Sequence, residues 1–194
     1  MKGKKLVLSV VAAVSSLIPL TVAAHPLVGD SIGFMSGLVH PLFGADHALA
    51  MLAVGLWLAR QSRRAVRYMP VAFAVLMVLG GSVASGSLPY AEHVAAFLLM
   101  MLGLMVVSAF NVNGTLGGLL ISGFAVFHGY AHGADMLLDT EAHAYSAGFV
   151  VATLGLLFAG IGLGGLFRRW GQEKLYRWAG GMSALAGVWV ALQF

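Results

Sequence analysis

The sequence predicts an all-α, polytopic membrane protein, in which six transmembrane helices follow a cleavable signal peptide. Of its 194 residues, 60% are hydrophobic and only 9% are charged. The mean hydropathy is +0.91, far above the range of soluble globular proteins. The chain contains no cysteine, so disulfides, thiolate metal sites and a cysteine nucleophile are all excluded.

The first segment has the pattern of a secretory signal. Three lysines among the first five residues precede an apolar stretch with a small-residue ending. The stretch of about fifteen apolar residues is short for a span, so we expect cleavage after Ala24. This divides the chain into a signal peptide at 1–24 and a transmembrane domain at 25–194, the alternative being an uncleaved first helix. The amine and imidazole of a new N-terminal His25 can chelate a cation together, although a flexible terminus without that role is equally consistent.

Six apolar runs after this signal predict six spans. The first is too long for a simple helix, because about 30 residues at about 1.5 Å each would reach about 45 Å. Since Pro41 and Gly44 lie in its middle, we expect a break there. Broken helices at membrane depth commonly line cavities that hold ions. The six runs are 30–59, 68–86, 90–110, 115–134, 144–166 and 175–193.

The placement of positive charge predicts the orientation. Basic clusters at 60–67 and 168–177 follow the first and fifth spans, and the positive-inside rule puts both in the cytoplasm. Both mature termini then lie on the periplasmic side, together with the acidic loop after the fourth span. The formal net charge of +4 resides in such clusters, so we interpret it as a topology signal and expect no nucleic-acid partner.

A first polar cluster, HPLFGADH, contains His40, Asp46 and His47. On a continuous helix the two histidines are nearly two turns apart and share a face. Asp46 points away from that face, so it either joins the site through the break or fixes the His47 tautomer. A single histidine would usually only hydrogen-bond a neighbouring helix. Two histidines and an aspartate this close together in an apolar segment predict a cation site.

A second polar cluster, FHGYAHGAD, contains His128, His132 and Asp135. The i, i+4 spacing stacks the two imidazoles on one helix face. Gly129 and Gly133 beside them allow a neighbouring helix to approach closely. The spacing alone is weak evidence, and it lacks the glutamate of the HExxH zinc-protease motif. Its intramembrane setting beside an aspartate predicts a role in metal handling.

Ligand chemistry narrows the identity of the ion. Imidazole with carboxylate and no thiolate suits Ni²⁺, Co²⁺ or Zn²⁺, whereas Mg²⁺ and Ca²⁺ favour all-oxygen sites. Glu92 and His93 begin the third span, where the carboxylate also has the simpler role of stabilising a helix N-terminus. We predict no catalytic residue and no permanently bound cofactor. The candidate metal-binding residues are His25, His40, Asp46, His47, Glu92, His93, His128, His132 and Asp135.

Three segments resemble the HupE/UreJ family, bacterial nickel/cobalt permeases often linked to hydrogenase or urease. They are HPLVGDSIGFMSGLVHPLFGADHALAMLAVGLW at 25–57, FHGYAHGAD at 127–135 and YSAGFVVAT at 145–153. The resemblance covers essentially the whole mature chain. It implies that the first cluster and both histidines of the second handle metal. By the same resemblance, many relatives have glutamate where this chain has Asp135, so the carboxylate here is shorter.

We therefore expect a permease, not an enzyme, in the bacterial inner membrane, moving Ni²⁺ or Co²⁺ from periplasm to cytoplasm for hydrogenase or urease maturation. Its expected partners are the ion and the lipid bilayer. The choice of ion, the energy coupling and a homo-oligomeric state stay open, and no GxxxxGK[ST] motif is present. Two other classes fit the same ligands. One is a membrane-embedded hydrolase whose Zn²⁺ activates water, and the other is a di-haem electron carrier, which would be coloured.

Overall fold

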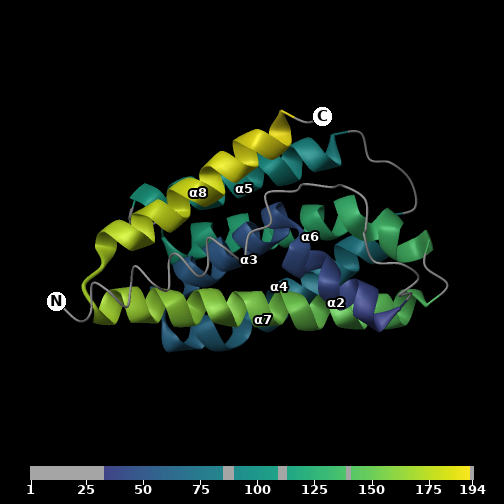
Figure 1. Ribbon diagram of the computed structural model, residues 1–194, viewed down its shortest axis with the longest axis horizontal. Coiled ribbons are helices and arrows are strands. Elements are labelled where there is room, and N and C mark those ends of the chain that lie inside the picture. The colour runs from purple at the N-terminus through teal and green to yellow at the C-terminus, as the bar shows by residue number, and fades with distance from the viewer. Residues whose placement is uncertain (1–32, 85–89, 109–112, 139–140, 193–194) are drawn as a thin grey trace.

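The computed structural model describes residues 33–84, 90–108, 113–138 and 141–192. Over these ranges the chain is helical and contains no strand (Figure 1), which confirms the predicted all-α class. The predicted signal peptide at 1–24 lies outside the described residues. In chain order the helices are α2 (Phe34–Phe43), α3 (Ala45–Leu58), α4 (Arg63–Ser82), α5 (Ala91–Ser108), α6 (Gly114–Leu138), α7 (Ala142–Arg169) and α8 (Glu173–Ala191).

Each predicted apolar run overlaps one of these helices, except the first, which contains both α2 and α3. Within the described residues, α4 and α7 are each long and apolar enough to cross a membrane, and the bent pair α2–α3 makes a third such span. The outer face of α4 exposes Tyr68, Val71, Val75 and Leu79, one helical stripe that suits contact with lipid. These features indicate a membrane protein, while the total of six spans stays a prediction.

The first apolar run breaks where Pro41 and Gly44 predict it. The axes of α2 and α3 differ by 77°, and Gly44 between them has an extended backbone with φ −72° and ψ 107°. Pro41 has no N–H to donate to the preceding turn, and the Gly44 N–H ends α2 by donating to the His40 carbonyl at 3.0 Å. The predicted break is therefore confirmed, and it lies beside the histidines.

α3 is the central helix of the bundle. It contacts α2, α4, α5, α7 and α8, and Met51, Val54 and Leu58 on it are wholly buried. A helix that is apolar on all sides is expected at the centre of a bundle, where every face meets a neighbour. In Figure 1, α5 and α8 run together along one edge of the bundle, and α4 and α7 lie along the opposite edge. The site is therefore built on a helix that its neighbours hold from several sides.

Glycines bring neighbouring backbones into direct contact at two of these interfaces. A Cβ atom on Gly129 of α6 would overlap the Met77 carbonyl oxygen of α4. At the α3–α7 interface, a Cβ atom on Gly160 would lie 2.9 Å from the Cα atom of Gly55. Small residues of this kind drive helix association in membranes, because they allow close van der Waals packing. The packing role predicted for Gly129 is confirmed.

Candidate metal site

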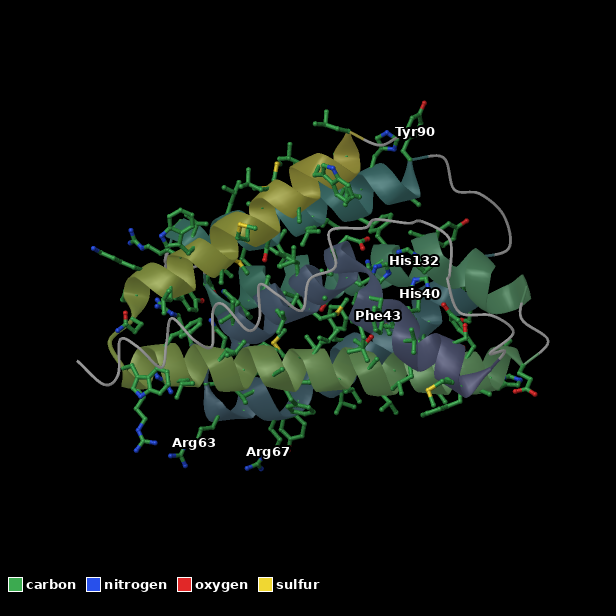
Figure 2. The ribbon with its side chains drawn as sticks, viewed as in Figure 1. His40, Phe43, Arg63, Arg67, Tyr90 and His132 are labelled. Atoms are coloured by element: carbon green, nitrogen blue, oxygen red, sulfur yellow. The ribbon has the colours of Figure 1, made fainter. Side chains whose placement is uncertain are left out.

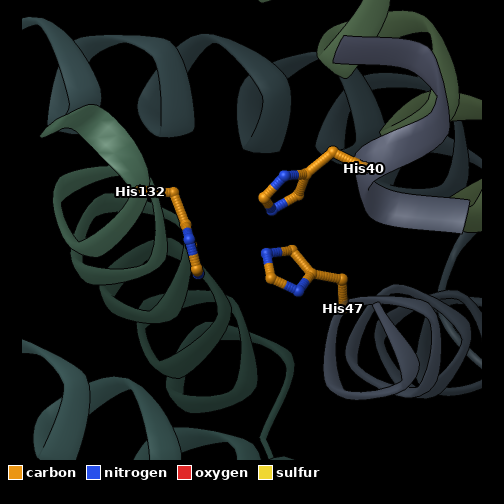
Figure 3. Close-up of side chains that lie close together, drawn as sticks. All are labelled: His40, His47 and His132. Atoms are coloured by element: carbon orange, nitrogen blue, oxygen red, sulfur yellow. The ribbon is translucent and has the colours of Figure 1, made fainter. Parts of the chain in front are cut away.

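Three histidines from three helices meet at the α2–α3 break (Figure 3). They are His40 of α2, His47 of α3 and His132 of α6, and we call them the histidine triad. Each offers one ligand atom, and these atoms all lie within 4.8 Å of one another. The structure thus brings residues of both polar clusters into a single site.

The break itself produces this geometry. On a continuous helix, seven residues separate two side chains by about 10 Å along the axis. Here the ring centroids of His40 and His47 lie 5.0 Å apart, and that of His132 lies 4.3 Å from His47. The 77° bend sets α2 nearly perpendicular to α3, and the His40 ring thereby lies beside the His47 ring. The sequence that breaks the helix therefore also brings the two imidazoles together.

Asp46 orients His47 rather than joining the triad. Its Oδ1 atom lies 3.0 Å from Nδ1 of His47. An ionised carboxylate can only accept a hydrogen bond, so Nδ1 carries the proton and the lone pair is left on Nε2. That Nε2 atom is buried without a hydrogen-bond partner, and Figure 3 shows it directed toward His40 and His132. The structure places Asp46 beside His47 and outside the triad, which is the arrangement expected if its role is to fix the tautomer.

His128 lies one turn before His132 on α6, directly behind the triad. Its ring centroid is 4.6 Å from His47 and 4.9 Å from His132. Its Nε2 atom is also buried without a partner, although His128 is not one of the three converging ligands. Leaving a polar nitrogen buried and unsatisfied costs about 1–3 kcal/mol. A cation bound in this cluster would give the two buried nitrogens a partner.

A small cavity adjoins the histidine cluster. Its volume is about 60 Å³, which exceeds the roughly 10–15 Å³ that a cavity needs to hold a water molecule. Asp46, His128 and His132 supply its polar atoms, and the remaining lining is apolar. The cavity therefore has room for water beside these polar groups.

Two aromatic residues of α7 close the site on the opposite side. The Phe149 ring lies 5.6 Å from that of His40 and 6.1 Å from that of His47. The Tyr145 ring lies 6.2 Å from that of His40, and both aromatic side chains are buried. Neither residue was among the ligands predicted from the sequence, because that prediction was built on imidazoles and carboxylates. The signal was present in YSAGFVVAT, which contributed only to the family resemblance.

Of the four other candidate ligands, the structure describes only the side chain of His93. His93 is exposed at the start of α5, and its ring lies 5.7 Å from that of Tyr90. The backbones of Glu92 and Asp135 lie within α5 and α6, but the structure does not describe their side chains. His25 lies wholly outside the described residues. Metal binding by these four residues stays a prediction.

Comparison with known proteins gives two matches. The model of a family described as HupE / UreJ protein matches residues 12–190. Protein HupE of Rhizobium leguminosarum bv. viciae is 39% identical over 169 residues, which cover 85% of this chain and 88% of that protein. No solved structure matches the chain significantly. The family match includes every helix that forms the site.

Proposed function

Because the chain belongs to the HupE/UreJ family, we propose that it is an inner-membrane permease that moves Ni²⁺ or Co²⁺ from the periplasm to the cytoplasm. Proteins of this family are permeases, not enzymes, and are generally associated with nickel or cobalt transport for hydrogenase or urease. The hydrolase alternative is therefore set aside. The observation that carries the proposal is the convergence of three imidazoles within an apolar helix bundle.

The ligand set supports a borderline transition metal as the substrate. Imidazole nitrogens suit nickel, cobalt and zinc, and hard cations favour sites made wholly of oxygen. Three protein nitrogens leave coordination positions for water. A transport site must release its ion, so an incomplete, water-completed shell is suitable. The cavity beside His128 accommodates that water.

Charge supports the proposed orientation of the chain in the membrane. Arg63, Arg67 and Arg168 lie at one end of the bundle, where α3 and α7 end and α4 begins. The positive-inside rule assigns that end to the cytoplasm, so the α2–α3 break lies toward the periplasm. The predicted external ligands His25 and Glu92, with their neighbours, would then meet the ion before the triad does. On this basis the chain crosses the membrane six times after the signal peptide.

Metal accumulation in cells tests the proposal. Cells expressing wild type or His47→Ala are exposed to Ni²⁺ and to Co²⁺ separately, and the cell-associated metal is measured at matched protein levels in the membrane. We expect the substitution to abolish most of the uptake, because it removes the triad member whose tautomer is set. His143→Ala removes an exposed histidine outside the triad and should leave uptake near wild type. Equal uptake by wild type and His47→Ala would overturn the proposed role of the triad.

A further inference from the structure

A second polar feature lies about 18 Å from the triad, estimated from the rise per residue along α3. A groove of about 570 Å³ opens where α3 and α7 end and α4 begins. Three arginines and Gln61 line it together with apolar residues. Neither the metal-binding triad nor the proposed transport uses this groove.

The three arginines converge from two helices. Arg63 and Arg67 are one turn apart on α4, so their side chains share a face, and both are exposed at the same edge of the bundle (Figure 2). Arg168 reaches the groove from the end of α7, and its guanidinium donates to the Ala59 carbonyl at 3.2 Å. One cationic group is thus held in place, and two others extend into solvent beside it.

No carboxylate compensates this charge within the described residues. Arg63 and Arg67 form no ion pair there, and no aspartate or glutamate lines the groove. Arg60 differs, because it pairs with Glu173 and its guanidinium lies 3.8 Å from the centre of the Tyr176 ring. The nearby acidic residue is therefore already engaged. Three like charges around one hollow repel one another, and a bound anion would relieve that repulsion.

The groove also has an apolar wall. Val66 and Ile161 line it together with the arginines. A free inorganic anion would contact only the arginines. A ligand that uses both parts has a charged phosphate attached to hydrocarbon chains.

We propose that this groove binds an anionic phospholipid, with Arg63, Arg67 and Arg168 around the headgroup phosphate and an acyl chain along Val66 and Ile161. Guanidinium groups suit phosphate because their planar N–H donors bind two oxygens at once. Basic residues near a membrane surface add about 1 kcal/mol each to the binding of anionic lipid. The bound lipid would link the ends of α3 and α7 to the start of α4.

Thermal unfolding of the full chain in neutral detergent tests this proposal. The purified protein is titrated with phosphatidylglycerol, phosphatidylcholine or inorganic phosphate. We expect phosphatidylglycerol to raise the Tm more than phosphatidylcholine does, and inorganic phosphate to have little effect. An equal rise with both lipids would overturn the proposal. A rise with inorganic phosphate as large as that with phosphatidylglycerol would assign the groove to a free anion and overturn the lipid assignment.

Two variants locate the effect. The double variant R63Q/R67Q should weaken the apparent affinity for phosphatidylglycerol about thirty-fold, from a factor of about five per arginine. Arg64→Gln removes a charge from the same turn of α4 without touching the groove, so it should change the affinity little. Equal loss in both variants would indicate diffuse surface charge and contradict a defined site. If the double variant does not fold, Arg63→Gln and Arg67→Gln are each compared with Arg64→Gln, and equal losses of affinity would again contradict a defined site.

Discussion

A very close helix contact beside the candidate metal site supplies a sharp test of how packing positions the histidines. Gly129 lies between His128 and the third triad member on α6, and it packs against the backbone of α4. In Gly129→Ala, the added Cβ atom would overlap the Met77 carbonyl oxygen and would lie 2.7 Å from the Met77 carbonyl carbon. Ordinary contacts to a Cβ atom begin at 3.4 Å. One helix must therefore withdraw by at least about 0.7 Å, because close-packed interiors transmit such strain rather than absorb it.

This displacement exceeds what a metal site tolerates. Ligand positions must be held to about 0.5 Å or better for binding, and α6 carries His132 only three residues after Gly129. We expect metal affinity and uptake to fall about tenfold or more, together with a loss of stability of about 1–3 kcal/mol from overpacking. The measurements are Ni²⁺ titration of the purified protein by calorimetry and metal accumulation in cells.

The same helix provides a matched control. A Cβ atom on Gly123 of α6 would have no neighbour within 4 Å, so Gly123→Ala makes the same chemical change without a clash. It should bind and transport metal like wild type. Wild-type metal affinity in a correctly folded Gly129→Ala protein would refute the claim that the α4–α6 contact sets the ligand geometry.

Three further predictions concern the triad and its surroundings. Asp46→Asn should weaken Ni²⁺ binding about 10- to 100-fold, because the His47 tautomer is no longer set and loss of a ligand-orienting carboxylate typically has this effect. Unchanged Ni²⁺ affinity in calorimetry would count against that role. Phe149→Ala should lower the free energy of unfolding by about 3–5 kcal/mol, because it opens a cavity. Phe158→Ala, at an exposed position on the same helix, should lower it little. Denaturation curves of the two variants measure the difference. Metal binding should be intact near neutral pH and weaken as the pH falls below about 6.5, because only neutral imidazole binds metal. Uptake at pH 5.5 as high as at neutral pH would argue against histidine ligation.

Hydropathy predicted the helices better than it predicted their ends. The second run was expected to begin at residue 68, yet α4 begins at Arg63. Its first turn is capped by Ser62, whose side chain accepts a hydrogen bond from the Ala65 N–H at 3.3 Å. Arginine is a good helix former, so the helix extends beyond the apolar part. Hydropathy reports which residues suit hydrocarbon, whereas backbone hydrogen bonding and capping decide where a helix stops.

By itself, the sequence established the residue types of the site and the position of the break. The sequence shows histidines beside an aspartate in apolar segments, and it shows Pro41 and Gly44 between His40 and His47. Both signals can be recognised without a structure, because the cost of burying a polar group and the backbone restriction of proline are local properties. Only the tertiary structure decided that His132 completes the triad while His128 lies behind it, and that Asp46 orients His47. These choices depend on the 77° bend and on glycine contacts between helices distant in sequence. The distances between side chains on different helices are set by packing, which no single segment of the sequence determines.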